Sequence, residues 1–363
     1  MEVFHVSESL VIQSHKGEYI AAFDADGISV LNSSPPEDCF VIIDKKIVEL
    51  YGDRLGNLLA VRPYLAIEAI ESNKSLDKFQ VYIEHLVEGK VRRGQQLIAI
   101  GGGIIQDITC FIATTMMRGL PWVFYPTTLL AQADSCIGSK SSINVGKIKN
   151  ILGTFTPPNK IIIDTSFLET LSRQELCSGI GEMLKVHAIK GPASFDEISL
   201  NYGQILDDQA VMEEFIFKSL KIKQKIVELD EFDVGPRNVM NYGHSFGHAI
   251  ESATNFGVPH GVAVTIGADM ANFVAASLGV STLAHFERMH PVLAANYSDF
   301  GQVDIPADDL LTALAKDKKN TSSQLRLILP DKEGVIGIGL YDNSEEFRAA
   351  CKRFLATVLP AGQ

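Results

Sequence analysis

The chain has 363 residues, which is more than one ordinary hydrophobic core accommodates, so we expect two domains. A net charge of −12 and an isoelectric point of about 5.2 disfavour nucleic acid or an anionic membrane as the main partner. The first residues do not form a signal peptide pattern, and no apolar run reaches transmembrane length.

The first half of the chain alternates apolar strands with amphipathic helices. Strands are predicted over residues 39–47, 95–103, 122–128 and 160–164, and a helix is predicted over residues 75–91. Apolar strands separated by helices are typical of parallel βαβ units. We therefore expect residues 1–168 to form an α/β domain with a Rossmann-like parallel sheet.

The second half changes to a helical period. Helices are predicted over residues 172–189, 210–231, 244–255 and 262–279. A strand pair with an Asp-Lys turn follows at residues 325–339. Residues 169–363 are therefore expected to form a second, mainly α-helical domain.

The predicted strand at residues 95–103 runs into a glycine run, IGGGIIQDI, which precedes a helix. Glycines there let backbone amides approach a pyrophosphate closely, although a run of three glycines can also be a simple tight turn. Other polar residues follow neighbouring strands and could reach ribose, phosphate or an amide, namely Asp44, Glu71, Lys74, Thr127 and Thr128. Together they favour a nucleotide cofactor at the carboxyl edge of the sheet.

Three of the nine histidines cluster near residue 250. His244 and His248 are four residues apart and share one face of a helix, and His260 follows. Glu182, in the segment GIGEMLK, can supply a carboxylate. Isolated histidines are commonly packed in a core, but a cluster with a carboxylate favours a divalent metal site.

Several basic residues lie in glycine-, asparagine- or aspartate-rich settings. Most single lysines and arginines are solvated surface charges. As a group, however, these cations indicate a small anionic substrate that carries phosphate and carboxylate. They are Arg118, Lys140, Lys149, Lys185, Lys223, Arg237, Lys318 and Lys319.

Six segments occur in order along the chain, namely GGGIIQD, RGLPWVFYPTTLLAQADSCIGSK, KNILGTF, GEMLK, DEFDVGPRNVMNYGHSFGHAIE and DKKN. Together they resemble 3-dehydroquinate synthase and the wider sugar phosphate cyclase family, and the resemblance extends from about Asp44 to about residue 319. The resemblance implies an NAD-binding α/β domain followed by a helical domain that binds Zn2+ or Co2+. It also implies a lyase of the shikimate pathway, which converts 3-deoxy-D-arabino-heptulosonate 7-phosphate to 3-dehydroquinate and phosphate.

The resemblance further implies roles for individual residues. The metal ligands would be Glu182, His244 and His260, with His248 assigned to proton handling. NAD contacts are expected at Asp44, Glu71, Lys74, Gly102, Gly103, Asp107, Thr127, Thr128, Lys149 and from Phe167 to Thr170. Catalytic and substrate contacts are expected at Asp134, Lys140, Asn150, Lys185, Lys223, Asp233, Arg237, Asn241 and one of the pair Lys318 and Lys319. Arg118 matches an arginine that reaches the neighbouring subunit's active site, which implies a homodimer.

The chain departs from the dehydroquinate synthase pattern at several positions. Gln106 and Ser139 stand where glycine is usual, Asp233 stands where glutamate is common, and residues 144–150 look more like the valiolone synthases of the same family. Arg237 nevertheless favours a carboxylated substrate, because a guanidinium binds carboxylate with two hydrogen bonds. Two alternatives stay open. One is a 2-epi-5-epi-valiolone synthase type that uses sedoheptulose 7-phosphate, and the other is a metal-dependent polyol dehydrogenase.

The pattern of cysteines indicates the cellular compartment in which the protein is expected to work. The five cysteines are scattered along the chain without a CxxC pair, which is typical of reduced thiols and offers no disulfide or zinc-finger framework. We therefore expect a cytoplasmic enzyme.

Overall fold

The computed structural model describes residues 9–316, 320–321 and 324–359, and they form two compact units. Unit 1 comprises the described residues up to Leu171 together with Lys223–Asp233, and unit 2 comprises Ser172–Ile222 and the described residues from Val234 onward. The sequence suggests a single division after residue 168. In the structure, by contrast, residues 223–233 belong to the first unit.

Unit 1 is built on a seven-stranded sheet in the order β1-β2-β9-β6-β5-β3-β4. Only β1 and β2 pair in antiparallel fashion, and every other neighbouring pair is parallel. The strands are β1 (Ser9–Ile12), β2 (Tyr19–Phe23), β3 (Cys39–Asp44), β4 (Tyr64–Ile67), β5 (Gln96–Gly101), β6 (Trp122–Pro126) and β9 (Lys160–Ile163). The predicted parallel α/β domain is therefore confirmed.

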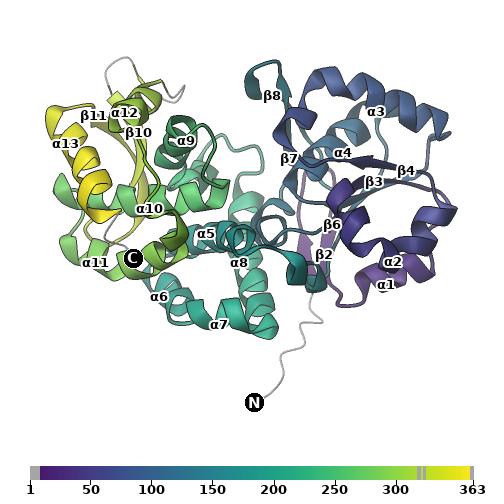
Figure 1. Cartoon of the computed structure of the whole chain (residues 1–363), viewed down its shortest axis with the longest axis horizontal. Helices are drawn as coiled ribbons and strands as arrows, with labels where there is room; N and C mark the ends of the chain where they lie inside the picture. The colour runs from purple at the N-terminus through teal and green to yellow at the C-terminus, as the bar shows by residue number, and fades with distance from the viewer. Residues whose placement is uncertain (1–8, 317–319, 322–323, 360–363) are drawn as a thin grey trace. The chain divides into compact units, whose positions relative to one another are not determined.

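Helices cover both faces of this sheet. Figure 1 shows α1 and α2 on one side of β3 and β4 and α3 and α4 on the other. Val41 and Ile43 of β3 belong to the core under α1 and α2, while the alternating residues Phe40 and Ile42 are equally buried. Strands that are buried on both faces read as continuous apolar runs, which explains the pattern in the sequence. The helices are α1 (Gly27–Ser33), α2 (Lys45–Val61), α3 (Leu76–Glu88) and α4 (Gly103–Thr115).

The order of the strands reverses at β3. From β3 the chain crosses to β4 on one side, and it then returns to β5 on the other side. In open α/β sheets, ligands bind at the carboxyl ends of the strands beside such a switch point. Ile43 of β3 is in register with Ile100 of β5, so Asp44 and Gly101 end these two strands side by side.

Unit 1 also contains elements that the sequence patterns did not predict. A two-stranded sheet is formed by β7 (Lys140–Val145) and β8 (Ile148–Phe155), which are antiparallel. A π-helix lies at η3 (Ala131–Ser135), and 3-10 turns lie at η1 (Glu71–Lys74), η2 (Met116–Arg118) and η4 (Thr165–Thr170). Several candidate site residues lie on these short elements.

Unit 2 is mainly helical, as predicted. Its helix α10 is buried along almost its whole length and packs against α5, α9 and α11 (Figure 1). A helix that is apolar on all sides belongs in the middle of a helical domain. The helices are α5 (Arg173–Lys190), α6 (Pro192–Leu200), α7 (Tyr202–Asp207), the part of α8 (Gln209–Leu229) up to Ile222, α9 (His244–Ala253), α10 (His260–Ser277), α11 (Leu283–Asn296), α12 (Ala307–Ala315) and α13 (Glu345–Arg353).

Local signals explain where the main elements of unit 2 begin and turn. Ser172 and Glu175 form a reciprocal capping box at the start of α5, which fixes the helix that carries Glu182. The predicted strand pair is β10 (Gln324–Pro330) with β11 (Ile336–Asp342), and the Asp331 carboxylate accepts the amide hydrogens of Glu333 and Val335 in the turn. Within the described part of the chain, no helix is long and apolar enough to cross a membrane.

Candidate functional site

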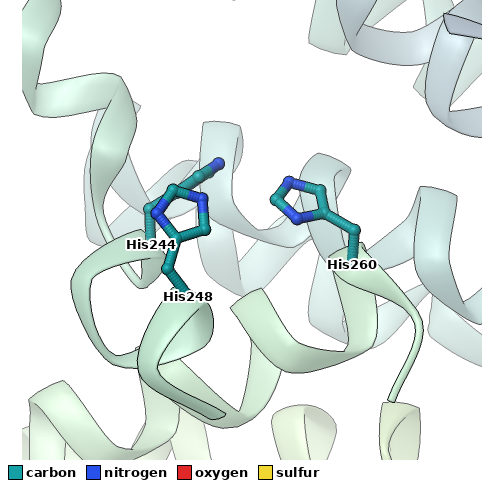
Figure 2. A group of neighbouring side chains, drawn as sticks. All are labelled: His244, His248 and His260. Carbon is teal, nitrogen blue, oxygen red and sulfur yellow. The ribbon is translucent and has the colours of Figure 1, made fainter. Parts of the chain in front are cut away.

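Three histidine side chains of unit 2 converge (Figure 2). His244 and His248 come from α9 and His260 begins α10, and one ring nitrogen of each lies within 4.8 Å of the others. Glu182 of α5 joins them, because its Oε1 lies 3.8 Å from His244 Nε2 and 3.5 Å from His260 Nε2. Ligands on a tetrahedral zinc ion are about 3.3 Å apart, so this set is close to the spacing of a metal site.

The outer nitrogens of two rings are also engaged. His244 Nδ1 lies 3.3 Å from the carbonyl oxygen of Tyr242, and His260 Nδ1 lies 3.2 Å from Glu251 Oε1. When an acceptor holds a proton on Nδ1, the lone pair is left on Nε2. In both rings Nε2 faces Glu182, so two lone pairs and a carboxylate oxygen point toward one place where a divalent cation can bind.

Close helix packing brings Glu182 to the histidines. A Cβ added to Gly261 would overlap the backbone carbonyl of Ser178, and one added to Gly181 would overlap the carbonyl of Gly261. Helices α5 and α10 therefore approach each other through glycine. The Gly261 amide also donates to Ser178 Oγ at 3.0 Å, which fixes the start of α10 against α5.

A second close approach positions His244. Gly243, which precedes α9, has a left-handed φ of 76°, and its added Cβ would lie 2.6 Å from the carbonyl oxygen of Val264 in α10. A side chain is disfavoured at this position by both φ and space. Glycine therefore lets α9 begin against α10.

Burial and neighbouring charges set the protonation of the cluster. Burial, together with the charge of Lys185, lowers the pKa of His244 well below its ordinary value, so this ring is neutral and able to bind a metal. Burial also acts to lower the pKa of His260, but the hydrogen bond to Glu251 and the charge of Glu182 raise it overall. Lys185 Nζ lies 2.5 Å from Glu182 Oε2, so the buried carboxylate has a counter-charge.

The glycine run forms the carboxyl edge of the sheet in unit 1. Gly102 is the N-cap of α4 and provides no side-chain cap, so the first amides of this helix remain for a ligand. A Cβ on Gly102 would lie 3.0 Å from Thr128 Cγ2, which places Thr128 directly beside the glycine. The amide of Thr127 donates to the carbonyl of Gly101 at 3.0 Å. Asp44 caps α2, because its Oδ1 accepts the Lys46 amide hydrogen. This candidate NAD contact therefore also has a structural role.

A polar network around the buried Lys74 joins candidates from different parts of unit 1. Lys74 Nζ donates to Asp107 Oδ2 and to Asn150 Oδ1, each at 2.9 Å, and lies 3.8 Å from Glu71 Oε1. Asn144 completes the network, since its Nδ2 donates to Glu71 Oε1 and its Oδ1 accepts the Asn150 amide hydrogen. Burial raises the pKa of Asp107 although Lys74 acts to lower it.

Two further candidate lysines form ion pairs within unit 1. Lys223 Nζ lies 2.6 Å from Asp134 Oδ1 and donates to the carbonyl of Asp134, and both residues are buried. Lys140 Nζ lies 2.8 Å from Asp233 Oδ2. Asp134 lies on the π-helix η3, an irregularity that is frequent at functional sites.

Backbone strain coincides with candidate positions. Arg118, Asn150 and Asp233 have φ values of 69°, 54° and 58°, and they are three of the seven described non-glycine residues with positive φ. Such conformations are uncommon for side-chain-bearing residues and concentrate at functional sites.

The remaining candidates have varied surroundings. Arg237 is only 8% exposed on η5 (Pro236–Asn241), and the Asn241 side chain donates to the carbonyl of Asn238. Tyr51 holds the η4 turn by donating to the carbonyl of Phe167 and contacting Thr170 Oγ1 at 2.9 Å. Gly103 begins α4, Lys149 and Arg118 are exposed, and Lys318 and Lys319 lie outside the described residues.

Some residues that contact the candidates were missed in the sequence. Glu251 follows His244 and His248 at the spacing i, i+4, i+7, which places all three on one helical face, so a signal was present. Asn144 gave no such signal, because its partners come from η1 and from the other strand of an unpredicted hairpin.

Comparisons with known proteins agree with this architecture. The family models described as 3-dehydroquinate synthase N-terminal and C-terminal match residues 64–178 and 179–320. A curated 3-dehydroquinate synthase from a Thermoanaerobacter species is 36% identical over 315 residues, covering 85% of this chain and 88% of the relative. One from Enterococcus faecalis is 34% identical over 337 residues, covering 92% and 94%.

A solved structure is similar along nearly the whole chain. It is a 2-epi-5-epi-valiolone synthase from Streptomyces hygroscopicus subsp. jinggangensis with NAD+ and Zn2+ bound. Its TM-score is 0.79 at 25% sequence identity, and the match covers 93% of this chain and 96% of that chain.

Proposed function

The chain belongs to the 3-dehydroquinate synthase family, and we propose that it converts 3-deoxy-D-arabino-heptulosonate 7-phosphate to 3-dehydroquinate and phosphate. The observation that carries this choice of substrate is the buried Arg237, on the turn directly before the histidine cluster. A guanidinium binds a carboxylate with two hydrogen bonds, and sedoheptulose 7-phosphate has no carboxylate.

We propose Zn2+ or Co2+ as the metal and NAD as the nucleotide cofactor. The donor set of Glu182, His244 and His260 fits the metal, because one carboxylate oxygen faces two Nε2 atoms at 3.5 and 3.8 Å. The uncapped start of α4 after Gly102 fits a pyrophosphate. When bound, NAD would supply a reversible hydride acceptor and the metal would supply a Lewis acid.

The chain's own residues bind, orient and handle protons. In unit 2, Arg237 and Asn241 hold the carboxylated end of the substrate, and His248 serves in proton handling. In unit 1, Lys140 and Asn150 bind phosphate, which retains its charge as it leaves and can itself accept the proton lost in the elimination. Positioning and charge compensation, more than covalent catalysis, are the protein's contribution.

The second candidate is a 2-epi-5-epi-valiolone synthase type of cyclase. It is supported by the segment at residues 144–150 and by the similarity to the Streptomyces structure. Asn144 and Asn150 flank the departing residues, and the Asn150 amide donates to Asn144 Oδ1 in unit 1, so the departure lies beside a candidate site residue.

We propose a cytoplasmic homodimer in which Arg118 serves the neighbouring subunit. Arg118 supports this because it is exposed in a strained left-handed conformation at the end of η2, the turn that follows α4. All five cysteines are free and buried, as in a protein that keeps its thiols reduced.

Cofactor recycling tests the proposed reaction class. In the presence of the carboxylated substrate and NAD equimolar with enzyme, phosphate release should continue over many turnovers, because each hydride returns to the substrate. Absorbance of NADH should not increase with product. NADH formed in proportion to product, without phosphate release, would instead establish a polyol dehydrogenase.

A further inference from the structure

A carboxylate outside the candidate ligand set lies against one of its histidines. Glu251 Oε1 is 3.2 Å from Nδ1 of His260, and Nε2 of the same ring is 3.5 Å from Glu182 Oε1. The Glu251 side chain is only 14% exposed, so water competes weakly for this contact. Because Glu251 is on α9 and His260 begins α10, the contact also spans the turn between the two helices.

We propose that Glu251 is a positioning residue that holds His260 in the tautomer and orientation needed to bind a divalent metal. It accepts the Nδ1 hydrogen, and Nε2 then keeps its lone pair toward Glu182. This inference rests on the metal site of the proposed function, and it assigns a residue outside the candidate ligands.

Imidazole chemistry explains why the acceptor matters. A neutral ring carries its hydrogen on either nitrogen, and only one of the two tautomers presents a lone pair at Nε2. A carboxylate on the opposite nitrogen selects that tautomer, restrains the ring and increases its basicity toward a metal.

The comparison with His244 shows what Glu251 adds. His244 Nδ1 faces a backbone carbonyl, that of Tyr242, at 3.3 Å. The atom that faces His260 Nδ1 in the same way belongs to an anionic side chain, that of Glu251. Lys185 already neutralises part of the Glu182 charge through its ion pair, so Glu251 supplies further negative charge close to a bound cation.

Metal affinity is the direct test. The dissociation constant for Zn2+ or Co2+ would be measured by competition with a chelator in wild type, Glu251→Ala, Glu251→Gln and the control Glu287→Ala. Glu287 is an exposed glutamate on α11. Glu251→Ala should weaken binding about 10- to 100-fold. Glu251→Gln should lose less, because its amide oxygen still accepts the Nδ1 hydrogen, and Glu287→Ala should match wild type.

A double variant separates positioning from a structural role. If Glu251 acts through His260, adding Glu251→Ala to His260→Ala should change the metal affinity by less than about twofold. The absorption spectrum of bound Co2+ should shift in Glu251→Ala and stay at the wild-type form in Glu287→Ala.

Two results would overturn the inference. One is unchanged metal affinity in Glu251→Ala and Glu251→Gln, and the other is an equal loss whether or not His260 is present. Wild-type protein that binds no metal would overturn the proposed function as well. Wild-type protein that binds metal while Glu251→Ala binds equally well would overturn this inference alone.

Discussion

Arg237 is the residue on which the proposed choice among sugar phosphates depends. Its guanidinium presents a planar fork of N–H donors, and the residue is 8% exposed. A buried arginine is rarely retained without groups that match its geometry. In the proposed function a substrate carboxylate is one such group, and a lysine in place of Arg237 would keep the charge but lose the planar fork.

Arg237→Lys should therefore impair the reaction of the carboxylated substrate selectively. We expect a loss of about 1.5–3 kcal/mol of transition-state binding, the range for hydrogen bonds to charged groups. This corresponds to a decrease of about 10- to 150-fold in kcat/KM. Steady-state phosphate release measures it, with the exposed Arg173→Lys as control. Equal impairment with substrates that have and lack a carboxylate would contradict the assigned role.

Gln106 shows how a departure from the usual family pattern is accommodated. Its Nε2 donates to the carbonyl of Ser135 at 2.8 Å, and Ser135 Oγ donates to its Oε1 at 2.8 Å. Glycine at this position could not make either bond. The substitution thus ties α4 to the segment that holds Asp134, and this effect on a candidate site was not evident from the sequence.

At the scale of elements, the candidate metal cluster of Glu182, His244, His248 and His260 depends on helices that approach each other at glycines. Gly181 and Gly261 form the contact between α5 and α10, and Gly243 forms the contact between the start of α9 and α10. The donors come from three helices, so their spacing is set by these backbone contacts.

Gly261→Ala should destabilise unit 2 and disturb the metal cluster. Its methyl group would overlap the carbonyl of Ser178. Overpacking of this kind costs about 1–3 kcal/mol, and here the nearest atoms are the backbone carbonyl oxygen and carbon of Ser178, which cannot rotate away as a side chain can. Urea unfolding of the metal-free protein measures the change.

Gly203→Ala is the matched control for this variant. Gly203 is exposed on helix α7, and no atom lies within 4 Å of its added Cβ. Alanine there should be neutral or stabilise by about 0.5–1 kcal/mol, because it restricts the unfolded chain. If both variants unfolded at the same urea concentration, close packing at Gly261 would not be the reason for its glycine.

Elements with strong periodicity could be predicted from the sequence. The buried strands β3, β5, β6 and β9 and the helices α3, α5, α8, α9 and α10 are all confirmed. The hairpin of β7 and β8 was missed, since β8 is mostly exposed and has no apolar alternation to reveal it. Polar contacts between distant segments, such as Lys74 with Asp107 and Asn150, leave no periodic signal at all.

The whole molecule follows the predicted order of an α/β unit and then a helical unit, with one difference. Helix α8 begins in unit 2, but its residues from Lys223 onward belong to unit 1. Its sequence pattern is continuous over this point, so periodicity cannot mark the transition. Lys223 pairs with Asp134 of unit 1, which is a contact between residues far apart in sequence.

Global stability should depend on pH through buried histidines of unit 2. Burial lowers the pKa of His187 to about 4, and burial with the charge of Arg288 lowers the pKa of His285 to about 4. Both rings are therefore neutral in the folded protein, while the unfolded chain takes up protons below its pKa of about 6.5. Their contribution to stability is complete above about pH 6.5 and is lost as the pH falls toward 4.

His187→Asn should reduce this dependence. His187 Nδ1 lies 2.8 Å from Ser194 Oγ, and an asparagine amide reaches nearly the same position. The wild-type ring accounts for a loss of about 3 kcal/mol between pH 7 and pH 4, by linkage. Urea unfolding at several pH values should show a shallower decline for the variant. If stability fell equally with pH in the two proteins, His187 would take up its proton as readily in the folded protein as in the unfolded chain, which would contradict the lowered pKa.

The most direct test of the proposed function compares two substrates with the purified wild-type protein. It is offered 3-deoxy-D-arabino-heptulosonate 7-phosphate and sedoheptulose 7-phosphate in parallel, with NAD and Zn2+, while phosphate release and product mass are recorded. We predict phosphate release and the mass of 3-dehydroquinate from the carboxylated substrate, and no cyclised product from the other. Cyclisation of sedoheptulose 7-phosphate, with the carboxylated sugar left unchanged, would contradict the proposal and establish a valiolone type of cyclase.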